Sequence, residues 1–385
     1  MLNKEKTIPY GHQWIDDSDI KEVIKVLKTD WITQGPKVEE FEKAVAKYCG
    51  AKYAVAVSSG TVALHAAYAV AGIGPGNEVI TTPLTFAATA NAVVYCGGKP
   101  VFVDIESDTF NINPEFIEGL ITSKTKAIAP VDFAGHPCDY EEILKIAKRH
   151  KLLVIEDAAQ SFGAEYKGKR IGSFADLTTL SFHPVKTITT GEGGMILTNN
   201  KGFYEKLKVF RHHGIIKKPE RGGWYYEIKD LGHNFRITDF QCALGLSQLK
   251  KVGKFIKRRR EIVAKYNKAF KNIKEIILPT EKEDRKSAWH LYIIQLSLEK
   301  LKTNRKKIFE TLQKNGLGVQ VHYLPIHLHP FYKKKFGYKI GDFPIAENYY
   351  NRAITLPLFP KMTDKEVNRV ITTVKKIINL SKNVI

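Results

Sequence analysis

The sequence has few cysteines and no long uninterrupted hydrophobic run. Its most apolar stretch, residues 53–73, is broken by serine, threonine, histidine and glycine, so a buried strand, turn and helix explain it better than a membrane span. The first ten residues lack the apolar core of a signal peptide. The cysteines show no CxxC spacing, which argues against a zinc knuckle and a disulfide framework; they are Cys49, Cys96, Cys138 and Cys242. We therefore expect a cytoplasmic protein without a membrane anchor.

Acidic residues are scarce relative to basic ones. The chain has 40 Asp and Glu against 60 Lys and Arg, a net charge of +20. Such a charge can indicate nucleic-acid binding, an anionic substrate, or only a lysine-rich composition. The basic residues are spread along amphipathic segments such as 250–274 and 300–314, and no helix-turn-helix, zinc-finger or RNP pattern is present. A non-catalytic, basic nucleic-acid-binding protein is therefore the weaker alternative, and we expect no nucleic-acid partner.

A metal site is not expected either. The best candidate ligands are His322, His327 and His329, which lie close together in the sequence. No acidic residue or cysteine stands near them at a spacing typical of metal ligands. We therefore predict that the protein has no metal site.

Strand and helix patterns alternate through the first two thirds of the chain. Buried strands are expected at 54–57, 78–82, 100–104, 126–133, 152–155 and 177–182. The intervening helices are expected at 62–71, 87–95, 114–121 and 140–150, after amphipathic helices over 16–29 and from Pro36 onwards. This alternation predicts an α/β fold whose mostly parallel sheet is covered on both faces.

The 385 residues are enough for two domains. A large domain is expected over residues 1–250, where the helix 239–249 ends it. A basic helix over 255–270 is expected to link it to a smaller α+β domain over residues 251–385. That domain is predicted to contain a strand pair near 290–298 and 318–322 and helices at 304–315, 345–353 and 364–380.

Two polar residues follow buried strands in the stretch 152–198. Asp157 comes after the first strand and Lys186 shortly after the second, and ligands of open α/β sheets sit at this carboxyl edge. Each residue alone is more often a cap or a surface charge. Together they suit pyridoxal 5′-phosphate (PLP): the lysine amine would form a Schiff base with the cofactor aldehyde, and the aspartate would hold the pyridine nitrogen protonated.

Three further segments could complete such a site. Ser58-Ser-Gly-Thr61 lies between a strand and a helix, an arrangement that suits phosphate binding and helix capping about equally until Asp157 and Lys186 favour phosphate. Phe86 follows a strand end and is equally well interpreted as a ring that stacks on a cofactor or as a core residue. A long basic and aromatic loop is expected between residues 203 and 235, and its length favours a role in binding a phosphate and a base or sugar.

At this point the residues resemble a known family nearly end to end. The landmarks are those of the DegT/DnrJ/EryC1/StrS sugar aminotransferases, in the right order: Thr33-Gln-Gly35, Ser59-Gly-Thr61, Thr81-Thr-Pro-Leu-Thr-Phe-Ala87, Gly135-His-Pro-Cys-Asp139, Glu156-Asp-Ala-Ala-Gln160, Ser181-Phe-His-Pro-Val-Lys186, Gly191-Glu-Gly-Gly194, Gly232-His-Asn-Phe-Arg236 and Val321-His-Tyr323. The resemblance implies the fold type I architecture, with a mostly parallel seven-stranded sheet between helices and a smaller C-terminal domain.

The resemblance also implies roles for individual residues. Lys186 would bind the cofactor covalently and move the proton, and Asp157 would pair with the pyridinium. The remaining cofactor-binding residues would be Ser59, Gly60, Thr61, Phe86, Gln160, Ser181 and Asn234, with Asn234 reaching the cofactor of a neighbouring subunit. Candidate substrate-binding residues are His183, Lys217, Arg236, His322 and Tyr323. A homodimer with active sites at the interface is therefore implied.

Within the family, the segments 181–190 and 211–214 are most similar to members of the pseudaminic acid branch. This implies amination of C4 of a UDP-linked 4-keto-6-deoxy-N-acetylhexosamine, with L-glutamate as donor and 2-oxoglutarate as product. The alternative is the same chemistry on a 3-keto nucleotide sugar or on the precursor of 4-aminoarabinose.

Overall fold

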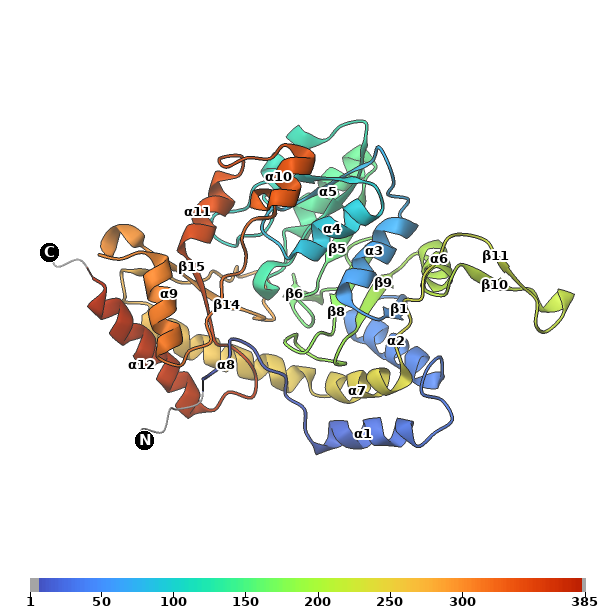
Figure 1. Ribbon diagram of the computed structural model, residues 1–385, viewed down its shortest axis with the longest axis horizontal. Helices are drawn as coiled ribbons and strands as arrows, with labels where there is room; N and C mark the ends of the chain where they lie inside the picture. Colours follow the sequence, from blue (N-terminus) through green and yellow to red (C-terminus); the bar gives the residue numbers. More distant parts are fainter. Residues whose placement is uncertain (1–6, 383–385) are drawn as a thin grey trace.

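A sheet of seven strands forms the centre of the N-terminal part of the molecule (Figure 1). The computed structural model describes residues 7–382, so most of the first ten residues considered above lie outside it. The strands are arranged in the order β1-β9-β8-β5-β4-β2-β3. Strand β9 is antiparallel to both of its neighbours, and the other adjacent pairs are parallel. The strands are β1 (Tyr53–Val57), β2 (Glu78–Thr81), β3 (Lys99–Phe102), β4 (Thr125–Ala129), β5 (Leu153–Asp157), β8 (Leu177–Ser181) and β9 (Gly194–Thr198).

Helices cover both faces of this sheet, as the alternating sequence pattern predicts. In β1, Ala54 and Ala56 belong to one core while Val55 and Val57 belong to the other, because successive side chains of a strand point to opposite faces. The first core includes buried residues of α2 (Pro36–Cys49) and α5 (Tyr140–His150). The second includes residues of α3 (Gly60–Val70), α4 (Ala87–Tyr95) and α6 (Lys201–Arg211).

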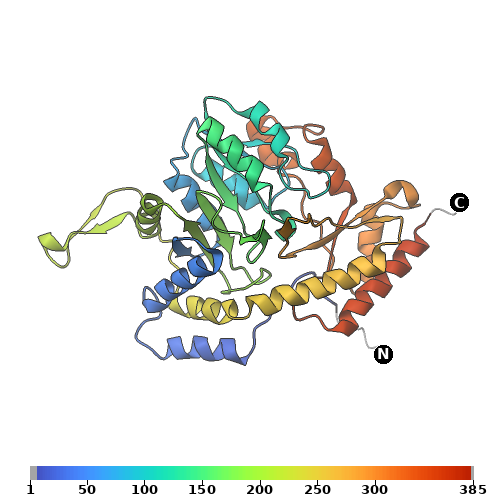
Figure 2. The ribbon, with the colours of Figure 1, turned by 180° about the vertical axis from the view of Figure 1, so that it is seen from behind.

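The C-terminal part has its own core. Helix α7 (Asp239–Leu249) is followed by the long helix α8 (Val252–Phe270), which runs from the large sheet to the C-terminal elements (Figure 2). Strands β12 (Ile276–Ile277), β14 (Tyr292–Leu296) and β15 (Ala353–Leu356) form an antiparallel sheet there. The helices near it are α9 (Arg305–Lys314), α11 (Pro344–Arg352) and α12 (Asp364–Leu380), whereas α10 (Pro330–Phe336) packs beside the large domain, where the Tyr332 hydroxyl donates to Asn91 Oδ1 (2.7 Å). The domain boundary at residue 250 stays a prediction.

Two smaller sheets complete the fold. Strands β6 (Glu165–Tyr166), β7 (Lys169–Arg170) and β13 (Arg285–Lys286) form one of them. Strands β10 (Ile215–Lys217) and β11 (Tyr226–Ile228) form a hairpin that projects from the body of the molecule (Figure 1). In the part of the chain that the structure describes, no helix is long and apolar enough to cross a membrane.

Three sequence predictions of local structure are wrong. Residues 114–121 form two 3-10 turns rather than an α-helix; Gly119, which adds no side-chain contacts and disfavours helix, falls within them. Residues 318–322 do not pair with β14, because β12 and β15 already occupy its two edges, and Gln320 makes only an isolated bridge to Thr355. The segment 203–235 is not one long loop, since α6 and the β10–β11 hairpin fill most of it.

Helix α1 (Asp17–Leu27) forms where the amphipathic pattern predicts a helix, but of its apolar residues only Val26 is buried. Ile20, Ile24 and Leu27 are exposed, whereas Asp19 is fully buried against α7. The Asp19 carboxylate accepts hydrogen bonds from Ser247 Oγ (2.6 Å) and Gln248 Nε2 (2.7 Å). The helix is therefore attached to the large domain through the side that carries Asp19 and Val26, and among the described residues nothing covers Ile20, Ile24 and Leu27.

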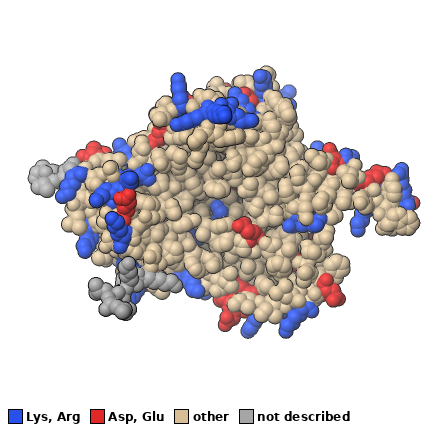
Figure 3. Space-filling model, in the orientation of Figure 1, with Lys and Arg blue, Asp and Glu red and all other residues tan. Residues whose placement is uncertain are grey.

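Charged residues do not form one continuous basic surface on the face seen in Figure 3. Lysine and arginine side chains lie in separate groups near the rim of that face, several of them beside acidic residues. Ion pairs also occur elsewhere on the surface, for example between Lys145 and both Glu141 and Glu142 on α5. This face therefore gives no support to a basic groove for nucleic acid.

Candidate active site

A cavity of about 500 Å³ lies at the carboxyl ends of the parallel strands. Its wall is completed by residues of the C-terminal part, so it lies between the two cores. The structure brings together in this cavity most of the residues that the sequence singles out: Ser59, Gly60, Thr61, Phe86, Asp157, Gln160, Ser181, His183, Lys186, His322 and Tyr323. Within residues 7–382, no cluster of three or more His, Cys, Asp and Glu is suited to hold a metal ion.

Lys186 and Asp157 line the cavity at the carboxyl ends of two neighbouring strands, β8 and β5. Asp157 is the last residue of β5, and Lys186 lies in the turn after β8, where its backbone N–H donates to His183 O (2.9 Å). Desolvation lowers the pKa of the Lys186 amine to about 8. Burial raises the pKa of Asp157. The hydrogen bonds that its carboxylate accepts and the charge of Lys186 oppose this rise but do not cancel it. A lysine with such a pKa is neutral often enough near pH 7 to act as a nucleophile and as a base.

The lowered pKa of Lys186 leads to a prediction for cofactor capture. Only the neutral amine attacks an aldehyde, so the rate at which the cofactor-free protein reacts with PLP is expected to rise with pH and to level off above about pH 8. Stopped-flow absorbance after mixing with PLP measures this rate. An inflection near pH 10, as for an ordinary lysine, would show that burial does not act on Lys186 as described.

Thr89 is a residue of this site that sequence reasoning missed. It lies in α4, one turn after Phe86, and its Oγ1 donates to Asp157 Oδ2 (2.6 Å). Thr85 Oγ1 lies 2.7 Å from the Thr89 hydroxyl, and the Ala159 N–H donates to the other oxygen, Asp157 Oδ1 (3.1 Å). These contacts fix the orientation of the carboxylate and favour its charged form. No motif identifies Thr89, because a threonine within a helix carries no signal of its own.

Changing Thr89 to valine is expected to lower turnover about tenfold near neutral pH, since a hydrogen bond to a charged group is worth roughly 1.5–3 kcal/mol. The hydrogen bond favours the ionised carboxylate, so its loss raises the pKa of Asp157. The acid limb of the kcat–pH profile should therefore shift to higher pH. The matched control is Thr178→Val, which removes a threonine donating to the buried Glu156 Oε2 at the same 2.6 Å outside the cavity. Equal profiles for the two variants would contradict the role of Thr89.

The loop before α3 has the geometry of an anion site. Ser59 is the N-cap of α3, and its Oγ accepts from the Val62 N–H (3.2 Å). A Cβ at Gly60 would lie 2.8 Å from Ser181 Cβ, and one at Gly194 would lie 2.2 Å from Ser59 O. Both positions therefore need glycine so that the loop can pack against β8 and β9. The first N–H groups of the helix and the hydroxyls of Thr61 and Ser181 are left facing the cavity.

Gln160 and two aromatic residues form the opposite wall. The Gln160 Oε1 accepts from the Ala134 N–H (2.7 Å), and its Nε2 donates to the Tyr323 hydroxyl (3.0 Å). Phe86 is 59% exposed, and its ring centroid lies 6.0 Å from that of Tyr323. The ring of Phe86 is thus open to the cavity rather than part of the core, and its stacking on a cofactor ring stays a prediction.

Histidines line the remaining wall. His183 is exposed in the turn before Lys186, and His322 is buried, with its Nδ1 2.8 Å from Thr355 Oγ1. Burial and the charge of Lys186 lower the pKa of His322 to about 4, so this ring is neutral at physiological pH. Sequence reasoning did not connect Tyr10, Glu192 and His290 with the site, although they line the same cavity.

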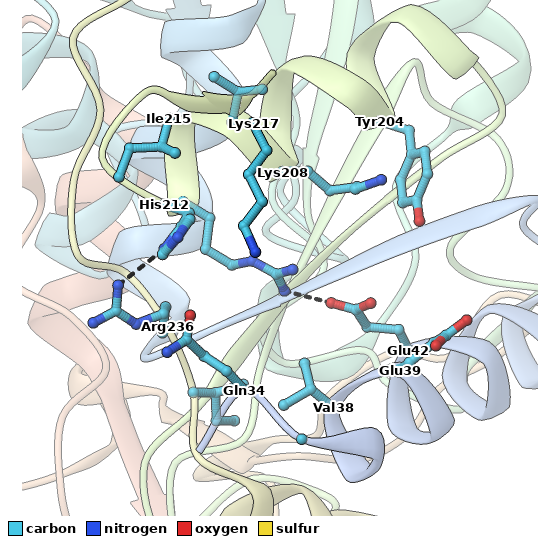
Figure 4. A pocket seen from close by; sticks show the side chains of 14 residues that line it. Gln34, Val38, Glu39, Glu42, Tyr204, Lys208, His212, Ile215, Lys217 and Arg236 are labelled. Carbon is cyan, nitrogen blue, oxygen red and sulfur yellow. Dashed lines mark hydrogen bonds and ion pairs between the residues drawn. The ribbon is translucent and has the colours of Figure 1, made fainter. Parts of the chain in front are cut away.

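Lys217, Arg236 and Asn234 do not line the Lys186 cavity of the same chain. Lys217 and Arg236 face a second cavity of about 690 Å³ between α2, α6 and the start of the hairpin (Figure 4). There Arg236 lies 3.0 Å from His212 Nδ1, and Arg211 pairs with Glu42. Asn234 forms an isolated bridge with His212 near this cavity. These three sequence-predicted residues can contribute to a site at Lys186 only if they belong to another subunit that packs against this cavity.

The residues at the Lys186 cavity fit PLP. The cofactor needs an amine for its aldehyde, a carboxylate for its ring nitrogen and donors for its phosphate. The cavity offers Lys186, the buried Asp157 and the glycine-dependent loop at the N-terminus of α3. The fold and this donor set define a PLP-dependent aminotransferase of fold type I.

The chain belongs to the DegT/DnrJ/EryC1/StrS aminotransferase family, whose profile matches residues 13–375. It is 44% identical to the spore coat polysaccharide biosynthesis protein SpsC of Bacillus subtilis, over 96% of this chain and 97% of that protein. It is 42% identical to the UDP-4-amino-4,6-dideoxy-N-acetyl-beta-L-altrosamine transaminase of Campylobacter jejuni, over 97% and 98% of the two chains.

Solved structures agree with this assignment. The structure of Helicobacter pylori PseC, an aminotransferase of pseudaminic acid biosynthesis, matches with a TM-score of 0.93 and 36% identity over 97% of this chain and all of that one. The PLP form of the sugar aminotransferase Spr1654 from Streptococcus pneumoniae matches with a TM-score of 0.92 and 33% identity, over 97% and 99%. The protein is therefore a PLP-dependent sugar aminotransferase, as its sequence predicts.

Proposed function

We propose that this protein transfers an amino group from L-glutamate to C4 of a UDP-linked 4-keto-6-deoxy-N-acetylhexosamine. The observation that carries the proposal is the 42% identity, over nearly the whole chain, to a transaminase named for the corresponding 4-amino sugar nucleotide. The Lys186 cavity supports it, because it offers both a buried amine and room for a sugar.

PLP supplies an aldehyde that takes up the amino group and a ring that withdraws electrons from the neighbouring C–H bond. In the proposed mechanism, the Lys186 amine holds the cofactor at rest, removes the proton from the donor carbon and returns a proton to the sugar carbon. Asp157, oriented by Thr89, keeps a proton on the ring nitrogen. Ser59, Gly60, Thr61 and Ser181 would hold the phosphate, Phe86 would stack on the ring, and Gln160 would lie near the phenolic oxygen of the cofactor.

His183, His322 and Tyr323 are proposed to contact the sugar from the cavity wall. Their exposure to the cavity supports this. Two of these rings, His322 and Tyr323, are uncharged at neutral pH, since burial lowers the pKa of the histidine and raises that of the phenol. Uncharged donors and acceptors suit the hydroxyls of a sugar better than they suit a carboxylate.

The test is a comparison of keto sugars. The purified enzyme is incubated with L-glutamate and each of three UDP-sugars: the 4-keto-6-deoxy-N-acetylhexosamine, a 3-keto sugar and the 4-keto precursor of 4-aminoarabinose. Mass spectrometry of the amine formed gives kcat/KM for each, and the first sugar is expected to be preferred. The similarity to SpsC favours the second candidate function, the same reaction on another keto sugar; a higher kcat/KM for either rival would establish it.

We further propose that the enzyme is a homodimer whose subunits share their active sites. Exposed apolar side chains lie at two places, on α1 and at or beside the projecting hairpin, where Trp224 and Leu231 are more than four-fifths exposed (83% and 81%); among the described residues nothing covers them. Lys217, Arg236 and Asn234 lie outside the Lys186 cavity of their own chain. In the proposed dimer they act at the cavity of the partner.

A mixing experiment tests shared sites. Lys186→Ala and Asn234→Ala proteins are each expected to be inactive or weakly active alone. After subunit exchange, a hybrid dimer would contain one site with both residues intact, and random mixing should restore roughly a quarter of wild-type activity. If Asn234 acts within its own chain, no hybrid has an intact site and mixing restores nothing. Size-exclusion chromatography with light scattering checks the dimer itself.

A further inference from the structure

His290 is a buried histidine of the Lys186 cavity without an assigned role. It is 5% exposed and lies in the segment that leads into β14. Its ring lines the cavity, and its buried Nδ1 has no hydrogen-bond partner among the described residues. Leaving a buried polar atom unpaired costs free energy. Because this unpaired nitrogen lies in the cavity of the reactive lysine, we expect a bound ligand to supply its hydrogen-bond partner.

The backbone around His290 is held in an uncommon conformation. Trp289 has a φ of 50°, which a bulky residue adopts only when its surroundings enforce it. Its indole is buried in the C-terminal core, so the next side chain, that of His290, is directed to the cavity. The guanidinium of the buried Arg259 donates to the carbonyl oxygens of Trp289 (3.2 Å) and His290 (3.2 Å) and fixes both residues.

The large domain packs against this segment at Gly135. A Cβ at Gly135 would lie 2.9 Å from the His290 N and 2.8 Å from Gln160 O. Only glycine, at its φ of +93°, lets these backbones approach so closely. The Ala288 N–H donates to Gly135 O (2.9 Å), and the Leu291 N–H donates to Ala134 O (3.3 Å). His290 is thus fixed from both sides next to Gln160, and its position does not depend on a flexible loop.

The charge of the cavity decides which ligand group suits this ring. Burial, followed by the charges of Lys186 and Arg259, holds the pKa of His290 well below its usual range, so the ring is neutral. Within the same chain, none of the described residues that line the cavity is an arginine, the side chain best suited to grip a carboxylate. In the proposed dimer, an arginine at this cavity comes only from the other subunit. A neutral imidazole at this position therefore matches an uncharged hydroxyl better than the carboxylates of glutamate.

We propose that His290 is a specificity-determining residue that hydrogen-bonds a hydroxyl group of the sugar ring bound beside Lys186. This inference rests on the proposed function, since it takes a keto sugar as the second substrate. If so, a change at His290 affects one of the two half-reactions and leaves the other unchanged. The ring serves the sugar half-reaction and is not needed when glutamate delivers its amino group.

The experiment measures the two half-reactions separately in the holoenzyme. Stopped-flow absorbance follows the cofactor after mixing with L-glutamate, and then after mixing the aminated enzyme with the UDP-linked 4-keto sugar. In His290→Phe, which keeps an aromatic ring, the apparent affinity for the sugar should fall about tenfold, the cost of one hydrogen bond. The rate with glutamate should stay within about twofold of wild type. In His290→Asn, which can still hydrogen-bond, much of the sugar affinity should return.

The control is His327→Asn. His327 is also fully buried with an unpaired Nδ1, but it pairs with Glu347 away from the cavity. This variant should lower the midpoint of thermal unfolding without separating the half-reactions. Calorimetric titration with the 4-amino sugar nucleotide provides a second readout, in which His290→Phe binds about tenfold more weakly.

The outcomes separate this inference from the proposed function. If the wild-type enzyme aminates none of the keto sugars, both fail. If the wild type is active but His290→Phe slows both half-reactions equally, or binds the sugar nucleotide as tightly as wild type, only the inference about His290 is overturned.

Discussion

Replacing Lys186 with alanine is expected to reduce turnover by at least about 10⁴-fold. Removing a general acid–base group alone costs roughly 10²–10⁴-fold, and Lys186 is also the group that binds the cofactor covalently. Within the same chain, no other amine is available to take over, because Lys186 is the only lysine among the described residues that line the cavity. Steady-state release of 2-oxoglutarate measures the loss.

Two comparisons make this result specific. The matched control is Lys145→Ala, which removes an exposed lysine paired with Glu141 and Glu142 on α5; its activity should stay within about twofold of wild type. Small primary amines added to Lys186→Ala should restore part of the proton transfer and raise the rate with amine concentration. Near-normal activity of Lys186→Ala would contradict the assigned role.

The sequence was sufficient to predict the sheet and the reactive pair. Strands 152–155 and 177–182 are short apolar runs, and the alternation of strands and helices earlier in the chain predicts a mostly parallel sheet with a common carboxyl edge. Asp157 and Lys186 come next in the chain, and the edge of the sheet brings them together. This prediction succeeds because each residue follows directly after a strand, and the pairing of those strands brings the two residues to the same edge of the sheet.

The residues that were missed depend on long-range packing. Thr89 reaches Asp157 across 68 positions of sequence, and a helical threonine gives no sign of such a contact. His290 enters the cavity only because Trp289, Arg259 and Gly135 fix its backbone. The apolar period of α1 predicts a helix correctly but does not say which face is covered, and here the buried Asp19 decides it.

The segment around the β10–β11 hairpin also shows that sequence does not predict contacts that depend on long-range packing. Its basic and aromatic composition predicts one binding loop, whereas the structure forms α6 and the β10–β11 hairpin there. Lys217 and Arg236 consequently face a separate cavity with acidic residues such as Glu39 and Glu42 on its wall (Figure 4). Composition identified residues suited to bind an anion but not the cavity in which they lie.

Changing Asp157 to alanine is expected to lower turnover about 10²- to 10³-fold while the fold is kept. A carboxylate close to a protonated ring nitrogen raises the pKa of that nitrogen by roughly one to three units, so without it the ring is mostly unprotonated at pH 7 and withdraws electrons poorly. Asp157→Asn should lose nearly as much, because the amide keeps the volume but not the charge. Single-turnover rates with glutamate, measured on enzyme loaded with PLP, report this effect.

The control for this prediction is Asp176→Asn. Asp176 also holds the sheet together, since its Oδ2 accepts from the Val154 N–H (2.8 Å) next to the same strands, but it does not line the cavity. It should change the midpoint of thermal unfolding more than the rate. A PLP analogue methylated at the ring nitrogen carries a permanent positive charge, and it should restore much of the lost rate in Asp157→Ala but not in Lys186→Ala. If Asp157→Ala turns over normally with PLP, or if the methylated analogue gives no recovery, Asp157 does not act by keeping the ring charged.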